Sequence, residues 1–202
     1  MAAFDRDAWE RRWEQALAEH GDALATRPPS AYLAELADLP PGRVLDAGCG
    51  HGAESIALAI AGWDVTAVDF SLAALDRGRR SAASFGPGVA DQISWVEGDL
   101  GVWTPEAGGY ELVLSLYVHV AGSVVETVQR LGSGVAEGGT IFLVGHQAVD
   151  PATGEDTMAA GQTQVSLGPA QEALDGWEIL VAEERTRQFG GGVDAVVRAR
   201  KA

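Results

Sequence analysis

Lysine, cysteine and basic charge are scarce in this sequence. Lys201 is the only lysine, which excludes a Schiff-base or phosphate-loop lysine from the rest of the chain. The single cysteine, Cys49, cannot form an internal disulfide. Lys and Arg number 14 against 29 Asp and Glu, so the formal net charge is -15. Because a basic face is the usual footprint of a nucleic-acid binder, we expect no nucleic-acid partner.

Long apolar runs are also missing. No stretch approaches the ~20 apolar residues of a membrane helix, and the first residues alternate charged and aromatic side chains where a signal segment would be apolar. We therefore expect a cytoplasmic protein that contacts no membrane. With 202 residues and 47% hydrophobic content, the chain can bury one substantial core. We predict a single domain over residues 1–202, present as a monomer or homodimer.

Helices are predicted ahead of the first strand, over residues 7–20 and 30–39. In the first helix, Trp9 and Trp13 recur on one face, which predicts that they are buried together. Ser30 can cap the second helix, which ends at the following prolines. We expect residues 1–40 to form a helical cap on the ligand side of a core over residues 41–202.

Short apolar runs then alternate with segments of helical periodicity. The runs predict strands at 43–47, 64–69, 93–97, 111–117 and 140–145, and the segments between them predict helices at 53–61, 72–84 and 123–135. Such near-continuous apolar strands fit a parallel sheet that is buried on both faces. Two further runs, at 177–186 and 193–200, are joined through a Gly-rich stretch that is typical of a hairpin. The predicted fold class is α/β, with an antiparallel edge at its C-terminal end.

A glycine-rich turn follows the first predicted strand, in Asp46-Ala47-Gly48-Cys49-Gly50-His51-Gly52. Glycines let a ligand lie directly against the backbone, and the amides of the helix that follows add a local positive field. Asp69 ends the next predicted strand, where its carboxylate can accept hydrogen bonds from ribose hydroxyls. Together these features indicate a bound adenosine-type nucleoside.

The glycines alone fit two cofactors, because Gly48, Gly50 and Ala53 also satisfy the dinucleotide fingerprint. The flanking acidic residues distinguish between these two cofactors. Asp46 would repel a pyrophosphate, but it suits the ammonium and sulfonium end of S-adenosylmethionine. Asp99 ends the third predicted strand and can accept from an adenine amino group. Acids at three strand ends therefore favour the sulfonium cofactor.

With these motifs in order, the sequence resembles the class I S-adenosylmethionine-dependent methyltransferases. The motifs that carry the resemblance are VLDAGCGHG at 44–52, AVDFS at 67–71, WVEGDL at 95–100, YELVLSLYVHV at 110–120 and AEGGTIFLVGH at 136–146. The resemblance implies a Rossmann-like, doubly wound, seven-stranded sheet that is mostly parallel and ends in an antiparallel hairpin. Within the family, the sequence is similar to the small single-domain type that includes the tellurite-resistance, thiopurine and thiol methyltransferases.

The resemblance also implies a function and a set of site residues. The function is methyl transfer from S-adenosylmethionine to sulfur, oxygen or nitrogen of a small molecule, with S-adenosylhomocysteine as the product. The cofactor-binding residues implied are Asp46, Gly48, Cys49, Gly50, Asp69, Phe70, Asp99, Leu100 and Ser115. In this set, Asp46 and the glycines hold the methionine part, Asp69 the ribose, and Asp99 with Leu100 the adenine.

We predict that the residues that contact the methyl acceptor lie just beyond the fourth strand, because open α/β sheets bind ligands at the carboxyl ends of their strands. His119 can act as a base toward a thiol or hydroxyl, and Tyr117 can orient the acceptor or shield the sulfonium. His146, after the fifth strand, is a second candidate base. We expect no metal, because the histidines lack paired ligand spacing, and Cys49 fits as a small packed residue better than as a nucleophile.

Two alternatives stay open. A non-catalytic module that binds the cofactor as a sensor or subunit fits the same motifs, because no base is certain from the sequence. A nicotinamide-dependent oxidoreductase fits the bare glycine pattern, although the chain has no Tyr-x-x-x-Lys pair. Methylation of DNA bases is disfavoured, because no Asn/Asp-Pro-Pro-Tyr/Phe motif follows the fourth strand.

Overall fold

The computed structural model describes residues 6–25, 28–119, 122–149, 153–154, 156, 163–187 and 192–202. The backbone packs as two compact units, which we call the N-terminal unit (residues 5–100) and the C-terminal unit (residues 101–202). Each unit is described by itself below. The prediction of a single domain over residues 1–202 stays a prediction.

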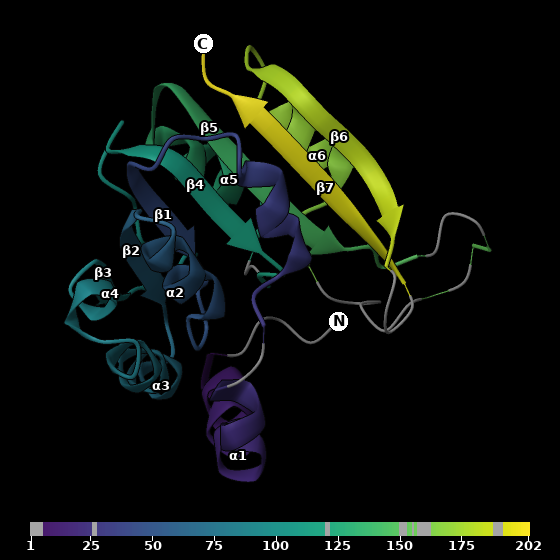
Figure 1. The fold of residues 1–202 in the computed structure, drawn as a ribbon. Coiled ribbons are helices and arrows are strands. Elements are labelled where there is room, and N and C mark those ends of the chain that lie inside the picture. The colour runs from purple at the N-terminus through teal and green to yellow at the C-terminus, as the bar shows by residue number, and fades with distance from the viewer. Residues whose placement is uncertain are drawn as a thin grey trace. The chain divides into compact units, whose positions relative to one another are not determined.

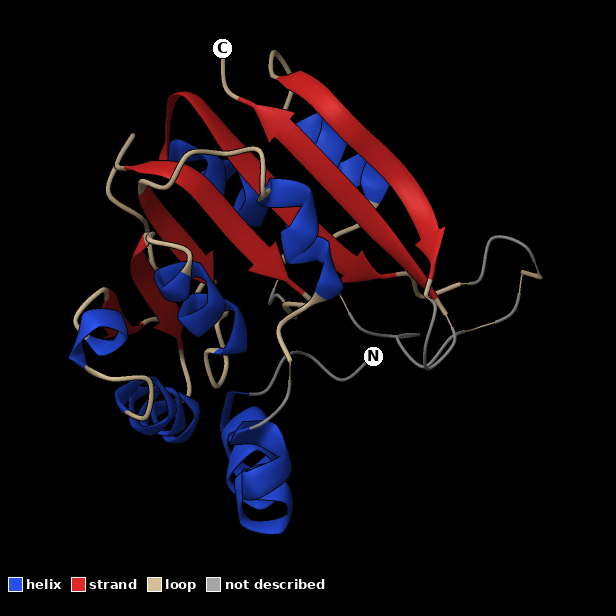
Figure 2. Cartoon of the chain, in the orientation of Figure 1, coloured by secondary structure: helices blue, strands red, loops and turns tan. Residues whose placement is uncertain are grey.

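The N-terminal unit alternates strands with helices in the order that the apolar pattern predicts (Figure 2). Its elements are α1 (Arg6–Ala25), a 3-10 helix η1 (Ala31–Leu36), β1 (Arg43–Ala47), α2 (Ala53–Ile60), β2 (Asp64–Asp69), α3 (Leu72–Ala83), α4 (Pro87–Ala90) and β3 (Ile93–Glu97). All three strands have the predicted bounds. They are parallel, with Val44 opposite Val65 and Val65 opposite Ile93. The parallel register brings the carboxyl ends of β1 and β2 to one edge.

The C-terminal unit consists of β4 (Tyr110–Leu116), α5 (Val124–Ser133), β5 (Val135–His146), α6 (Leu167–Ala173), β6 (Glu178–Thr186) and β7 (Val193–Arg200). Strand β5 runs parallel to β4, whereas β7 pairs antiparallel with both β5 and β6. Helices α5 and α6 lie side by side on one face of these strands (Figure 1). The apolar segments 112–114 of β4 and 141–144 of β5 are fully buried.

Strand order confirms the predicted fold class. The order is β3-β2-β1-β4-β5-β7-β6 in a seven-stranded sheet, and the antiparallel strands lie at the C-terminal end as the hairpin pattern predicts. This is the sheet that the resemblance implies, mostly parallel and ending in an antiparallel hairpin. No helix among the described residues is long and apolar enough to cross a membrane.

Three details differ from the sequence-based expectations. The helix predicted over residues 30–39 is the short 3-10 helix η1, although Ser30 does cap it by accepting from the Tyr32 amide. Strand β5 begins five residues before its predicted start, because the chain pairs with Tyr110 ahead of an irregularity at two glycines. Trp9 and Trp13, which were expected to be buried together, are only half-buried.

The sole lysine, Lys201, makes its contacts within the C-terminal unit. The Nζ atom of Lys201 donates hydrogen bonds to the carbonyls of Gly132, at 3.3 Å, and Val135, at 2.8 Å. It also lies 5.7 Å from the centre of the Trp177 ring. A cation at the C-terminal carbonyls of α5 is favourable for the helix dipole. Lys201 therefore has a structural explanation.

Gly78 of α3 is predicted to be intolerant of a side chain. A Cβ atom there would lie 2.4 Å from two ring atoms of Trp95, so the ring must move. We expect Gly78→Ala to lower the free energy of unfolding by about 1–3 kcal/mol, although helix propensity alone favours alanine by ~1 kcal/mol. Urea unfolding followed by circular dichroism measures the change.

Gly168→Ala in α6 is the matched control, because a Cβ there meets nothing within 4 Å. We expect this variant to be as stable as the wild type or slightly more stable. If both variants gain stability, the Trp95 contact does not restrict Gly78.

Candidate functional site

Glycine backbone geometry shapes the turn between β1 and α2. Gly48, Gly50 and Gly52 have φ values of 83°, 52° and 80°, a region that strongly favours glycine. The amides of Gly48 and Cys49 both donate to the Val68 carbonyl, at 2.8 and 3.0 Å, which anchors the turn to β2. The N-cap residue of α2 is Gly52, which makes no side-chain cap bond. The first amides of α2 can therefore serve an anionic or polar ligand group.

Asp69 ties the end of β2 to this turn. Its Oδ2 atom accepts from the Gly50 amide and its Oδ1 atom from the Ser71 amide, each at 2.9 Å. The side chain is buried, and burial raises the pKa of the carboxyl despite these two bonds. The Phe70 amide also donates to this carboxylate. A carboxylate has about four acceptor positions, so about one remains for a hydroxyl donor of a ligand.

Asp46 is the second buried acid of the turn. The Ser55 hydroxyl donates to its Oδ2 atom at 2.6 Å. Burial, followed by the nearby Glu54 carboxylate, raises the pKa of Asp46 from 3.8 to about 7. A cationic neighbour stabilises the ionised form of a buried carboxyl whose pKa is raised. The residue therefore fits the ammonium or sulfonium group of S-adenosylmethionine, and it does not fit a pyrophosphate.

The remaining sequence-predicted cofactor residues of this unit lie at the same strand ends. Cys49 is buried, and its Sγ atom lies 3.7 Å from the Gly50 carbonyl oxygen. Burial, together with Asp46 and Asp69, raises the pKa of the thiol well above its usual value, which keeps it protonated and poorly nucleophilic. After β2 and β3, Phe70 and Asp99 are half-buried and Leu100 is buried.

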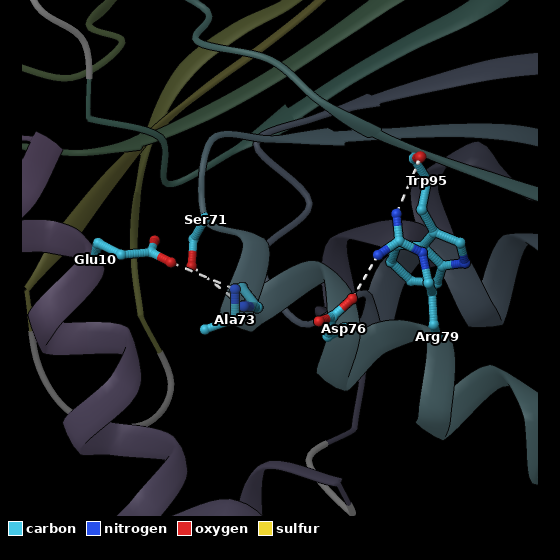
Figure 3. Close-up of polar contacts among 7 residues, drawn as sticks. Glu10, Ser71, Ala73, Asp76, Arg79 and Trp95 are labelled. Atoms are coloured by element: carbon cyan, nitrogen blue, oxygen red, sulfur yellow. Dashed lines mark hydrogen bonds and ion pairs between the residues drawn. The ribbon is translucent and has the colours of Figure 1, made fainter.

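Helix α1 contacts the turn through two residues. A Cβ atom on Gly50 would lie 3.0 Å from the Trp13 ring, and that ring is tilted against His51 with centroids 5.9 Å apart. Glu10 approaches the start of α3, where its Oε1 atom accepts from the Ala73 amide at 3.4 Å (Figure 3). Its Oε2 atom is buried without a hydrogen-bond partner, and its charge adds to the raised pKa of Asp69.

Sequence reasoning missed Glu10. The available signal was an acidic residue between Trp9 and Trp13 on the predicted packing face of the helix.

The C-terminal unit holds the predicted acceptor residues. Ser115 is buried on β4 opposite Leu143, and His119 is half-buried three residues beyond the end of β4. Tyr117 and His146 come together, with ring centroids 4.3 Å apart. Both contact Asp194, which the sequence reasoning did not single out.

Asp194 is the centre of this group of residues. The Tyr117 hydroxyl donates to its Oδ2 atom at 3.0 Å, and the Nδ1 atom of His146 lies 2.9 Å from its Oδ1 atom. The Nε atom of Arg187 lies 3.4 Å from the same Oδ1 atom. The only signal for Asp194 in the sequence was an acid within the apolar strand Val193-Asp194-Ala195-Val196-Val197.

Comparison with known proteins agrees with the geometry of the turn. A family model described as a methyltransferase domain matches residues 44–139. Thiocyanate methyltransferase 1 of Arabidopsis thaliana is 31% identical over 101 residues, which are 50% of this chain and 43% of that protein. The chain spans about half the length of the curated relatives it matches.

Solved structures share the fold. TehB from Haemophilus influenzae gives a TM-score of 0.71 at 18% identity, covering 91% of this chain and 65% of that one. The magnesium protoporphyrin IX methyltransferase from Synechocystis PCC 6803, solved with S-adenosylmethionine bound, gives 0.62 at 22% identity, covering 91% and 79%. The resemblance seen in the motifs is confirmed over residues 44–139, which match the family model of a methyltransferase domain.

Proposed function

We propose that the chain is an enzyme of class EC 2.1.1.-, which transfers a methyl group from S-adenosylmethionine to sulfur, oxygen or nitrogen of a small-molecule acceptor. The observation that carries this proposal is the turn of left-handed glycines flanked by the buried carboxyls of Asp46 and Asp69. It combines open backbone with two acids that suit a cationic nucleoside. S-adenosylhomocysteine is the product.

The two acids have different parts in holding the cofactor. Asp69 offers its remaining acceptor position to a ribose hydroxyl, while the amides of Gly50, Ser71 and Phe70 fix its orientation. Asp46, with its raised pKa, becomes ionised beside the cationic methionine end. Asp99 and Leu100 bind the adenine in this proposal. Gly48, Cys49, Gly50, Phe70 and Ser115 complete the binding set.

When bound, S-adenosylmethionine supplies a methyl carbon on a sulfonium, which a nucleophile displaces in line. Displacement of this kind depends mostly on alignment, and on a base when the nucleophile begins protonated. The residues of this chain therefore act by holding the cofactor and by positioning and deprotonating the acceptor. His119 and Tyr117 remain our sequence-based proposals for the acceptor side.

The relatives support a small acceptor. The Arabidopsis relative is named for thiocyanate, which is a small sulfur nucleophile. For this chain, with its net charge of -15, a small molecule is a better acceptor than a nucleic acid. We include thiols first among the acceptors to be tested, followed by phenols and amines.

Calorimetric titration of the whole chain with S-adenosylmethionine and S-adenosylhomocysteine tests the proposal. We expect stoichiometric binding of both, followed by turnover with at least one acceptor in a coupled S-adenosylhomocysteine assay. A folded sample that binds neither compound contradicts the proposal. Binding without turnover on any thiol, phenol or amine supports a non-catalytic module, and tight binding of NADH in place of either compound supports an oxidoreductase.

A further inference from the structure

Glu10 of α1 has a buried carboxylate oxygen, Oε2, that finds no hydrogen-bond donor among the described residues. Its other oxygen, Oε1, accepts from the Ala73 amide near the start of α3 at 3.4 Å, which is long for such a bond. Burial of an ionised oxygen is costly when no donor compensates for the lost water. A further donor at this place would therefore be favourable.

The Glu10 carboxyl lies near Asp69. Figure 3 shows the Glu10 side chain pointing from α1 toward Ser71 and Ala73 at the start of α3. The Ser71 amide donates to Asp69 at 2.9 Å in the same segment. Burial raises the pKa of Asp69, and the charge of Glu10 raises it further, because the two carboxyls are near each other. A ligand that brings hydroxyl donors to both acids relieves this repulsion.

Asp69 alone does not have enough acceptor positions for both hydroxyls of a ribose. The amides of Gly50, Ser71 and Phe70 donate to its carboxylate, which leaves about one of about four positions. The 2′ and 3′ hydroxyls of a ribose are neighbours, and each one loses its bonds to water when it is buried. The second hydroxyl needs another acceptor. Glu10 offers an oxygen that no described residue uses.

Helix α1 is fixed to the glycine turn one helical turn beyond Glu10. A Cβ atom on Gly50 would lie 3.0 Å from the Trp13 ring, and this ring also lies against His51, with centroids 5.9 Å apart. Glu10 and Trp13 are three residues apart in α1, so they project from the same face of the helix. The Trp13 contact thus holds Glu10 beside the turn that binds Asp69.

The Glu10 carboxyl can turn toward a ligand while α1 stays in place. The last torsion of a glutamate side chain is broad, so either oxygen can face a donor. The bond to the Ala73 amide is long, and a bond to a hydroxyl can replace it. The residue is only half-buried, so part of the side chain is accessible from outside.

We propose that Glu10 is a second ribose-binding residue, which accepts a hydrogen bond from one hydroxyl of the vicinal diol while Asp69 accepts from the other. This inference rests on the proposed function, because the ribose is that of S-adenosylmethionine. Helix α1 is then part of the cofactor site, and the two acids select a ribonucleoside over its deoxy counterparts. All of these groups lie within the N-terminal unit.

Ligands that lack one hydroxyl test the proposal. The probes are S-adenosylhomocysteine and its 2′-deoxy and 3′-deoxy analogues, each titrated calorimetrically into the full chain. We expect Glu10→Ala to bind S-adenosylhomocysteine about five- to tenfold more weakly than the wild type, as the loss of one hydrogen bond predicts. For one of the two analogues, the variant and the wild type should differ by less than about twofold. The hydroxyl that this analogue lacks is then the one that Glu10 holds.

Glu10→Gln separates ribose binding from the contact with α3. Its amide oxygen can still accept from Ala73, whereas its amide nitrogen cannot accept from a hydroxyl. We expect this variant to bind S-adenosylhomocysteine more weakly than the wild type and to depend on the same hydroxyl as Glu10→Ala. Wild-type affinity in Glu10→Gln, or an equal loss for all three ligands in Glu10→Ala, means that Glu10 only joins α1 to α3, and it overturns the proposal.

Glu14→Gln is the matched control, because Glu14 is exposed and lies about one helical turn further along α1. It should bind all three ligands with wild-type affinity. Circular dichroism shows whether each variant is folded. Folded Glu10→Ala with wild-type affinity for S-adenosylhomocysteine also overturns this proposal and leaves the proposed function intact. Wild-type protein that binds none of the three ligands overturns the proposed function itself.

Discussion

Asp69→Ala is expected to weaken binding of S-adenosylmethionine by at least about tenfold. The carboxylate holds the Gly50 and Ser71 amides at 2.9 Å each, so its loss releases the glycine turn and leaves two buried donors unpaired. It also removes the proposed acceptor of a ribose hydroxyl. A hydrogen bond to a charged group contributes about 1.5–3 kcal/mol, and 1.4 kcal/mol is a tenfold change in affinity. Calorimetric titration measures the effect.

Asp64→Ala is the matched control for this variant, because Asp64 begins the same strand with an exposed side chain. Its affinity should stay within about twofold of the wild-type value. Circular dichroism at the titration temperature shows whether each variant is folded. If folded Asp69→Ala binds the cofactor as tightly as the wild type, Asp69 does not contact the ribose.

Cofactor affinity is expected to fall as the pH drops below about 7, and Asp46 is the reason. In the free protein, burial raises the pKa of Asp46 to about 7, so acidification protonates this carboxyl. A bound cation favours the ionised form and lowers that pKa, so binding below pH 7 must release a proton. Affinity should therefore decrease by up to about tenfold per pH unit between pH 7 and the lowered pKa. Titrations from pH 5.5 to 8 measure this slope.

Asp46→Asn isolates the contribution of this residue, because the amide keeps the shape of the side chain and does not titrate. The variant should bind more weakly at pH 8, and its affinity should change less with pH. Titration in two buffers of different ionisation enthalpy counts the protons released at pH 6, which should be fewer for the variant. Equal slopes for the two proteins would mean that Asp46 does not contact the cationic part of the cofactor.

The glycine turn and its flanking strands were predictable because their determinants are local. The bounds of β1, β2 and β3 match the apolar runs, since each run ends at a polar or glycine residue. Strands β1 and β2 are buried over most of their length, whereas β3 buries only Ile93. Three glycines in seven residues predict a backbone that only glycine adopts readily, and all three have positive φ. The motifs that carry the family resemblance in this region are short continuous segments, because the determinants of the turn and its strands are local in the sequence.

Contacts between distant residues were not predictable. Glu10 and Ala73 are 63 residues apart in the chain, and His146 and Asp194 are 48 apart. No periodicity links either pair. The sequence predicted His119 as the base and His146 as a second candidate, because both follow an apolar run. The contact that separates them depends on the partner strand and its register.

The sequence by itself determined the α/β fold, the glycine turn and the acids that select its ligand, because periodicity and backbone preference act over a few residues. The tertiary structure alone decided which histidine is oriented by a buried carboxylate. Antiparallel pairing of β5 with β7 places Asp194 opposite His146, and a shift of one residue in that register would turn the carboxylate to the other face of the sheet. Register is a property of the packed strands, so the contact between His146 and Asp194 is fixed only when they are assembled.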